Sequence, residues 1–251
     1  MVLLHYLLYA LPTFSVANAY ELDKKLDFGN FLSSFDFIES HDKYTGGCAS
    51  YVSKDEATST GLARFVGNQD GRKSVRLESH DTIDNGIVIA DFIHLPANTC
   101  GHWRSSWHNC DYDVGGCSAI APYGTFGDSS NQNGGGIWAT QVEAEGIKIW
   151  HFARSNIPAD ITSDSPDPSK RGMPVVSLVL RNRDISKAWR RMKLIFNTTF
   201  CGESAGSEAW KDHTQCHAKT GVASCNDYVA KTPSAFDDVY FLVNSVRTYT
   251  R

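Results

Sequence analysis

Short segments in which apolar and polar residues alternate recur along the chain, and they constrain its fold more than any other sequence feature. They are rich in β-branched and aromatic residues and are separated by Gly, Pro, Asn and Asp. Such segments are typical of β-strands joined by turns, and no long helical period competes with them. The clearest ones cover residues 74–78, 87–93, 147–152, 175–180, 192–200 and 239–248. The pattern predicts an all-β chain folded as an antiparallel β-sandwich, with some strands covered on both faces.

The composition is that of a single globular domain. The chain has 251 residues, of which 41% are hydrophobic and 21% charged, and its formal net charge is -4. A mildly acidic chain has no electrostatic basis for binding nucleic acid or an anionic membrane, so we expect neither as a partner. No repeat or linker divides the sequence, and no internal apolar run approaches the ~18 residues that a membrane helix needs. We therefore expect one domain that is a monomer.

The first residues have the features of a secretory signal peptide. Residues 2–11 form an apolar stretch, and residues 17–19 read Ala-Asn-Ala, the small-x-small pattern that precedes a signal peptidase cut. The stretch is too short to cross a bilayer, which favours a cleaved leader over a membrane anchor. We predict a signal peptide at 1–19 and a folded domain at 20–251, secreted to the extracellular space or the cell wall.

Secretion makes the cysteines candidates for disulfides, because the compartment is oxidising. The count of seven is odd, so at least one thiol is left over or pairs between chains, and about 105 pairing schemes remain open. No spacing typical of a zinc site is found, and we predict no metal and no cofactor. Asn197 begins the one Asn-x-Thr sequon and is a predicted glycosylation site. The cysteines are Cys48, Cys100, Cys110, Cys117, Cys201, Cys216 and Cys225.

Several stretches, in this order along the chain, resemble a known family. Residues 71–76 read Gly-Arg-Lys-Ser-Val-Arg, residues 94–96 read His-Leu-Pro, and residues 100–107 read Cys-Gly-His-Trp-Arg-Ser-Ser-Trp. Residues 131–138 read Asn-Gln-Asn-Gly-Gly-Gly-Ile-Trp and precede 145–161, which begin Glu-Gly-Ile-Lys-Ile-Trp-His-Phe. Thr-Phe-Cys-Gly at 199–202, Cys-Asn-Asp-Tyr-Val at 225–229 and Pro-Ser-Ala-Phe at 233–236 follow. The ordered set resembles the fungal laminarinase-like branch of glycoside hydrolase family 16, the endo-1,3(4)-β-glucanases.

The resemblance implies a concanavalin A-like β-jelly roll with a cleft across its concave sheet. It also implies retaining hydrolysis of β-1,3-glucan or mixed-linkage β-1,3/1,4-glucan. Retaining hydrolysis needs two carboxyl groups about 5–5.5 Å apart, one as nucleophile and one as acid and base. The family carries both on one strand as Glu-x-Asp-x-x-Glu, and a bulge returns the second Glu to the cleft face.

This chain does not contain that motif. Only Glu21 has an Asp two positions later, and Leu26 stands where the second Glu is needed. The close pair Glu143 and Glu145 lies in a predicted hairpin and fits a solvated turn. Trp107 and His108 run directly into Asn-Cys-Asp at 109–111, a segment that resembles the family beyond its catalytic strand. We therefore expect that a block of a few dozen residues of the family has no counterpart here, and we predict no catalytic residue and a jelly roll incomplete around that strand.

The same resemblance suggests residues that contact glucan. Trp103 and Trp107 would stack on pyranose faces if they line the cleft, and core packing is the alternative. Asn133, Gly134 and Gly135 would let the backbone approach a glucan and donate amide bonds, and a tight turn explains them equally well.

Three further cleft candidates, Arg72, Arg154 and Glu203, are carried over from the family by position only. The sequence leaves three hypotheses open. The chain is an inactive member of a secreted β-glucanase family, a non-enzymatic β-glucan-binding protein, or a truncated gene-model or splice product of an active glucanase. Linkage preference and disulfide pairing are not determined by the sequence.

Overall fold

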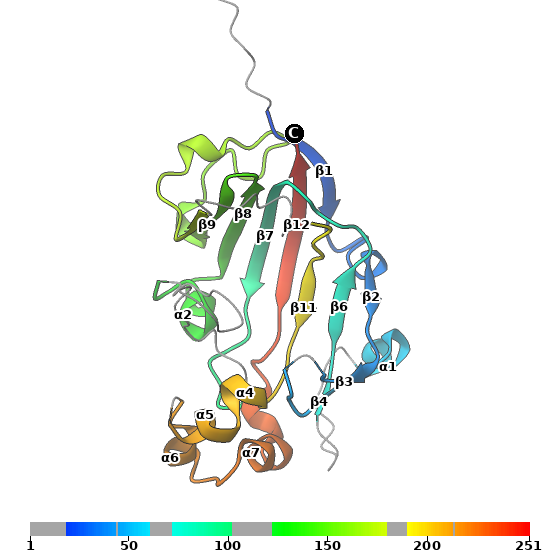
Figure 1. Cartoon of the computed structure of the whole chain (residues 1–251), viewed down its shortest axis with the longest axis vertical. Coiled ribbons are helices and arrows are strands. Elements are labelled where there is room, and N and C mark those ends of the chain that lie inside the picture. Colours follow the sequence, from blue (N-terminus) through cyan, green and yellow to red (C-terminus); the bar gives the residue numbers. More distant parts are fainter. Residues whose placement is uncertain (1–18, 44, 61–71, 102–121, 180–189, 213) are drawn as a thin grey trace, which may run out of the picture.

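The computed structural model describes residues 19–43, 45–60, 72–101, 122–179, 190–212 and 214–251 (Figure 1). This part of the chain is built from two β-layers and a group of short helices at one end (Figure 1). The predicted all-β sandwich is confirmed. No helix among these residues is long and apolar enough to cross a membrane.

The larger layer is a six-stranded sheet in which every neighbouring pair is antiparallel. Its strands, in spatial order, are β1 (Glu21–Leu26), β12 (Leu242–Thr250), β7 (Gly86–His94), β8 (Gly136–Glu143), β9 (Gly146–Ala153) and β10 (Val176–Val179). The central strand β7 buries residues on both of its faces, as its sequence predicted. The chain enters the sheet at one edge and ends beside it, because β1 and β12 are paired.

The second layer consists of two three-stranded sheets. One has the order β11 (Ile195–Asn197), β6 (Arg76–Ser79) and β2 (Phe35–Phe37), and is antiparallel. The other has the order β3 (Ser40–His41), β4 (Ala49–Tyr51) and β5 (Arg72–Ser74), in which β4 and β5 are parallel. The segment 74–78, predicted as one strand, is therefore two. The chain changes sheets at Val75, because the Ser74 hydroxyl is bonded to Thr198 while residues from 76 onward pair with β11 and β2.

The antiparallel three-stranded sheet of β11, β6 and β2 is called the smaller sheet below. The core between the layers joins this smaller sheet to only part of the six-stranded sheet. Its buried members are Leu26, Phe35, Leu77 and Val246, with Val88 and Ala90 packed against them. These residues come from β1, β12 and β7 on one side and from β2 and β6 on the other. Figure 1 shows the same offset: β11, β6 and β2 lie beside β12 and β1, and β8 and β9 lie on the far side of β7. The described second layer thus covers about half of the six-stranded sheet.

The opposite face of the six-stranded sheet has its own core. Ile87, Ile137, Ala139, Trp150 and Tyr249 are buried there. These side chains pack with the buried Ile161 of the segment after β9. This second core explains why the strands are apolar on both faces.

Short helices complete the fold. Among the described residues the α-helices are α1 (Lys54–Ser59), α2 (Gly127–Gln132), α4 (Gly202–Ala205), α5 (Ser207–Lys211), α6 (Cys216–Thr220) and α7 (Cys225–Lys231). The 3-10 turns are η1 (Leu32–Ser34), η2 (Arg154–Asn156), η3 (Pro168–Lys170) and η4 (Pro233–Phe236). Helix α7 ends at Lys231, before Pro233, which cannot continue a helix.

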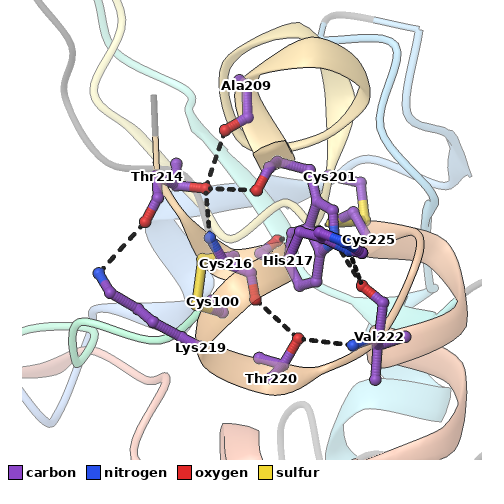
Figure 2. Close-up of a disulfide and its surroundings, with 12 residues drawn as sticks. Cys100, Cys201, Ala209, Thr214, Cys216, His217, Lys219, Thr220, Val222 and Cys225 are labelled. Atoms are coloured by element: carbon purple, nitrogen blue, oxygen red, sulfur yellow. Dashed lines mark hydrogen bonds between the residues drawn. A yellow bond between two sulfur atoms is a disulfide. The ribbon is translucent and has the colours of Figure 1, made fainter. Parts of the chain in front are cut away.

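Helices α4–α7 form a lobe held by two disulfides, Cys100–Cys216 and Cys201–Cys225 (Figure 2). The lobe surrounds the fully buried Trp210, whose indole N–H donates to the Val222 carbonyl at 2.9 Å. The bridges therefore tie the lobe both to the segment after β7 and to the end of β11. Disulfides were predicted from secretion, and two are present among the described residues.

Candidate functional site

The predicted sugar-contacting residues do not all lie in the described part of the chain. Trp103 and Trp107 fall outside it. Arg72 begins β5 and Glu203 lies in α4, but the positions of their side chains are not described. Arg154 and the turn at 133–135 are described, and the structure brings these together.

The turn after α2 is held by its own backbone. The amide of Asn133 donates to the Ser130 carbonyl at 3.1 Å, that of Gly134 to Asn131 at 3.0 Å, and that of Gly135 to Ser130 at 2.9 Å. Gly134 and Gly135 have φ of 75° and 80°. A Cβ on Gly135 would overlap backbone oxygens of β7. The glycines therefore let the turn after α2 lie directly against β7, and donation of these three amides to a glucan stays a prediction.

Arg154 joins this turn to β7. Its Nε donates to the Gly134 carbonyl at 3.1 Å, and its Nη2 to Asp91 Oδ1 at 2.6 Å and to the Phe92 carbonyl at 2.7 Å. Asp91 is only 6% exposed, and its other oxygen accepts from Asn244 at 2.8 Å. Within β7, Asp91 is an even number of residues from Ile87, so its side chain points away from the smaller sheet. Arg154 thus stabilises the ends of three strands, and its contact with substrate remains a prediction.

The outward face of the smaller antiparallel sheet carries residues that the sequence reasoning missed. Leu77 points into the core, so the alternating neighbours Arg76 and Glu78 point out. Arg76 donates from both Nε and Nη2 to Glu78 Oε1 at 3.1 Å, and Lys193 Nζ lies 3.7 Å from Glu78 Oε2. The alternation in 74–78 is the sequence signal that places Arg76 and Glu78 on the face opposite Leu77.

The Arg76–Glu78 pair is well placed to recognise a polar ligand. The two side chains are only 9% and 19% exposed, so the pair is largely shielded from water and held in one orientation. A guanidinium carries five N–H donors and a carboxylate only accepts, so a pair of this kind can both donate and accept hydrogen bonds with a polar ligand that reaches it, although Arg76 also makes a further contact within the protein. Asp36, directly opposite Glu78 on β2, is exposed and lies 3.0 Å from His80 Nε2.

A buried polar cluster lies beside this face. Asp42 accepts hydrogen bonds from the hydroxyls of Thr45 and Thr199. Burial raises the pKa of the nearby Tyr51 phenol. Asn197 Oδ1 is buried with no hydrogen-bond partner in the described part of the chain. The predicted glycosylation at Asn197 is therefore still a prediction, on a strand residue that is half-buried in the folded domain.

Metal chemistry finds no support among the described residues. No group of three or more His, Cys, Asp or Glu side chains there is arranged to hold a metal ion.

Beyond β7, the face of the six-stranded sheet that points toward the second layer is only partly covered. Val246, Ala90, Trp138 and His151 are register partners across four strands and so share one face. Val246 is 1% exposed, whereas Trp138 and His151 are only half-buried. Their rings meet edge to face at 4.8 Å, and burial lowers the pKa of His151, whose Nε2 has no described partner. The apolar stripe thus continues past the smaller sheet without a described strand above it.

Comparison with protein families gives a match over most of the chain. The model described as the XgeA-like catalytic domain of glycoside hydrolase family 16 matches residues 35–113 and 108–249. A probable glycosidase of Schizosaccharomyces pombe is 29% identical over 93% of this chain and 70% of its own length. The endo-1,3(4)-beta-glucanase XgeA of Emericella nidulans is 27% identical, and this chain spans 48% of its length.

These alignments are longer than the chain itself. The one with the Schizosaccharomyces pombe protein runs over 300 positions, which exceeds the 251 residues of this chain by 49. At least 49 positions of the relative are therefore aligned with a gap in this chain. The two matched stretches of the family model also meet, and overlap, at residues 108–113.

Two solved structures are similar over their whole length. An elongating family 16 β-1,3-glucosyltransferase is 32% identical, with a TM-score of 0.78 over 92% of this chain and 100% of that one. Laminarinase 16A from Phanerochaete chrysosporium, solved with β-glucans in its donor and acceptor sites, is 25% identical, with a TM-score of 0.77 over the same shares.

Proposed function

The chain belongs to the XgeA-like catalytic domains of glycoside hydrolase family 16, and from this premise we propose that it is a secreted, glucanase-type domain that binds β-glucan without hydrolysing it. The proposed ligand is β-1,3-glucan or mixed-linkage β-1,3/1,4-glucan, the substrate class in the names of its relatives. Retaining hydrolysis requires a nucleophilic carboxylate and an acid/base carboxyl group. Without the Glu-x-Asp-x-x-Glu strand, neither is supplied, and no covalent glycosyl intermediate forms.

One observation carries the inactivity. The alignments with relatives contain at least 49 positions with no residue of this chain, and the family match breaks at 108–113. That is the point at which the sequence resembles the family before and after its catalytic strand, but not within it. Among the described residues the second layer covers only part of the six-stranded sheet, which supports the same interpretation, since a strand absent from that layer leaves the face beneath it less buried.

The first test is hydrolysis. The purified protein, incubated with laminarin or lichenan, is expected to release no reducing ends above the buffer background. An active family 16 laminarinase, assayed in parallel, shows that the polymers are competent substrates. Robust release by the protein itself would refute the proposed inactivity.

The second test is binding. Titration with laminari-oligosaccharides up to millimolar concentration is expected to shift the tryptophan fluorescence, while α-linked malto-oligosaccharides leave it unchanged. Arg76→Lys keeps the charge but removes the planar guanidinium, and it should weaken the response if the outward face of β6 is the contact. No shift with any β-glucan would remove the binding proposal and leave the inactivity untouched.

The half-covered sheet also favours a second candidate, a truncated product of an active glucanase gene. Sequencing the transcript across the codons for Trp107 to Cys110 separates the two. A longer message that supplies Glu-x-Asp-x-x-Glu at this point would identify the chain as a shortened reading of a glucanase. If only the present message exists, the protein has lost its catalytic strand in nature.

Secretion belongs to the same proposal. Cleavage after Ala19 places Tyr20 at the new amino terminus, next to β1. N-terminal sequencing of protein recovered from the culture medium or the cell wall should begin at Tyr20. Protein that stays inside the cell with Met1 in place would contradict the signal peptide.

A further inference from the structure

A cavity of about 900 Å³ lies on the face of the six-stranded sheet that points away from the smaller sheet. Its floor is formed by Gln141 of β8 and by Lys148 and Trp150 of β9. Its walls are the segment 165–174 and the two ends of the domain, at Tyr20 and Arg251. The volume is within the ~300–1,000 Å³ typical of small-ligand sites. This cavity is on the opposite side of the sheet from the second layer and the Arg76–Glu78 face.

The cavity lining carries two basic side chains, Lys148 and Arg251, and one acidic side chain, Asp167, although the whole chain carries -4. Lys148 is exposed and makes no hydrogen bond or salt bridge with any described residue, so its charge is offset only by a longer-range interaction with Glu143. Arg251 lies over the Tyr20 ring and is 3.8 Å from Glu143, so its charge is only loosely paired. The one carboxylate in the lining, Asp167, is already neutralised by Lys170 at 3.1 Å.

A further cation, Arg171, lies behind the cavity wall. Arg171 precedes the lining residue Gly172, is 7% exposed, and holds its guanidinium 5.9 Å from the ring centroid of Trp150. None of its three guanidinium nitrogens has a hydrogen-bond partner in the described structure. A buried charge without hydrogen bonds is costly, and an anion nearby lowers that cost. Asp160 and Asp167 act on Arg171 electrostatically, but neither is hydrogen-bonded to it, so its charge is only partly compensated.

The remaining lining suits a sugar ring. Pro166, Pro168 and Pro174 offer rigid apolar surfaces for C–H groups, and the hydroxyls of Ser165 and Ser177 lie among them. Small-molecule sites typically combine such apolar walls with a few polar groups that fix orientation.

We propose that this cavity binds an anionic saccharide, whose carboxylate or phosphate group is held at Lys148. The site is independent of glucan binding at the outward face of β6. An extracellular protein with such a site would attach to charged polysaccharide while its other face remains open to neutral glucan.

The test is calorimetric titration of the full protein at low ionic strength with four probes. Trigalacturonate presents carboxylates and glucose 6-phosphate a phosphate ester, while laminaritriose is neutral and inorganic phosphate has no sugar. We expect at least one of the two charged sugars to bind at least tenfold more tightly than laminaritriose. This binding should weaken at 0.5 M salt, because salt screens the charges. Which charged sugar binds identifies the acidic group.

Lys148→Glu should weaken that binding at least tenfold, and Lys148→Ala by less. Lys54→Glu, at the exposed start of α1 on another part of the molecule, makes the same charge change and should have no effect (Figure 1). An equal loss in Lys54→Glu, equal affinity for laminaritriose, or no binding of either charged sugar would overturn the proposal. Binding of inorganic phosphate as tight as that of the sugars would also overturn it, because the cavity would then be an ion site only.

Discussion

Removing the Cys100–Cys216 bridge is expected to destabilise the domain more than removing Cys201–Cys225. The bridges close loops of 116 and 24 residues. A cross-link stabilises mainly by reducing the entropy of the unfolded chain, which gives about 4.8 kcal/mol for the longer loop and about 3.4 kcal/mol for the shorter one. The difference of about 1.4 kcal/mol depends only on the ratio of loop lengths.

The assay is urea unfolding of Cys100→Ala/Cys216→Ala and Cys201→Ala/Cys225→Ala, followed by circular dichroism. The first variant should also melt roughly 10–20 °C lower than the wild type, given about 2–4 °C per kcal/mol for a chain of this size. Both variants should show a larger m-value, because their unfolded chains expose more surface. Unfolding of the wild-type protein under reducing conditions is the control. It breaks the bridges but keeps the cysteine side chains, so the effect of losing the cross-link is separated from the effect of losing packed sulfur atoms.

The result that would refute this reasoning is specific. Both bridges pin the same lobe, and Cys201 and Cys225 are the more deeply buried pair. If packing of the lobe dominated, the variant without Cys201–Cys225 would lose as much stability as the other, or more. Such an outcome would show that the bridges act in the folded state rather than on the unfolded chain.

Three further predictions follow from single positions. Gly135→Ala should lower the melting temperature far more than Gly172→Ala. Both glycines have positive φ, but only at Gly135 would an added Cβ overlap backbone atoms. Equal decreases in melting temperature for the two variants would contradict this prediction. Burial lowers the pKa of His151 below its usual 6.5, so the unfolded chain takes up a proton there before the folded one does. Stability should therefore be lost as the pH falls below about 6.5, by up to ~1.4 kcal/mol per pH unit, and His151→Gln should flatten this slope in pH-dependent urea titrations. If Asn197 is glycosylated, endoglycosidase treatment will lower the mass of the secreted wild-type protein but not that of the Asn197→Gln variant. If the treatment leaves the mass of the wild type unchanged as well, Asn197 is not glycosylated.

The β-strands were predictable because their periodicity is local. Residues 87–93 and 147–152 lie in β7 and β9, within one or two residues of the observed bounds, and β10 covers Val176–Val179 of the segment predicted at 175–180. The helices α4–α6 were not foreseen. Each has only four or five residues, too few to show an amphipathic period, and they are held by the disulfides and by packing around Trp210.

The site was less accessible to sequence reasoning, because its contacts are long-range. Arg154 was selected by its position in the family, but its partner Asp91 lies 63 residues away. No local pattern identifies that pair. Arg76 and Glu78 could have been found, since assigning Leu77 to the core places its neighbours on the opposite face. The sequence does not show which other layer covers each face of this strand, so only the structure shows that Arg76 and Glu78 point away from the six-stranded sheet.

The three hypotheses differ in what they require of the half-covered sheet. Loss of a strand from the second layer removes cover from one face of β8 and β9 only. Their other face keeps a complete core, in which Ile137 and Ala139 are fully buried, and the disulfide-bonded lobe has a separate core around Trp210. Neither core contains the Trp138 side of the sheet. A chain without its catalytic strand therefore retains enough buried surface to fold, and a single sharp, two-state melt of the secreted protein is the expected behaviour. A broad, uncooperative melt would instead mean that the half-buried stripe at Trp138 and His151 destabilises the sheet, as expected of a truncated product.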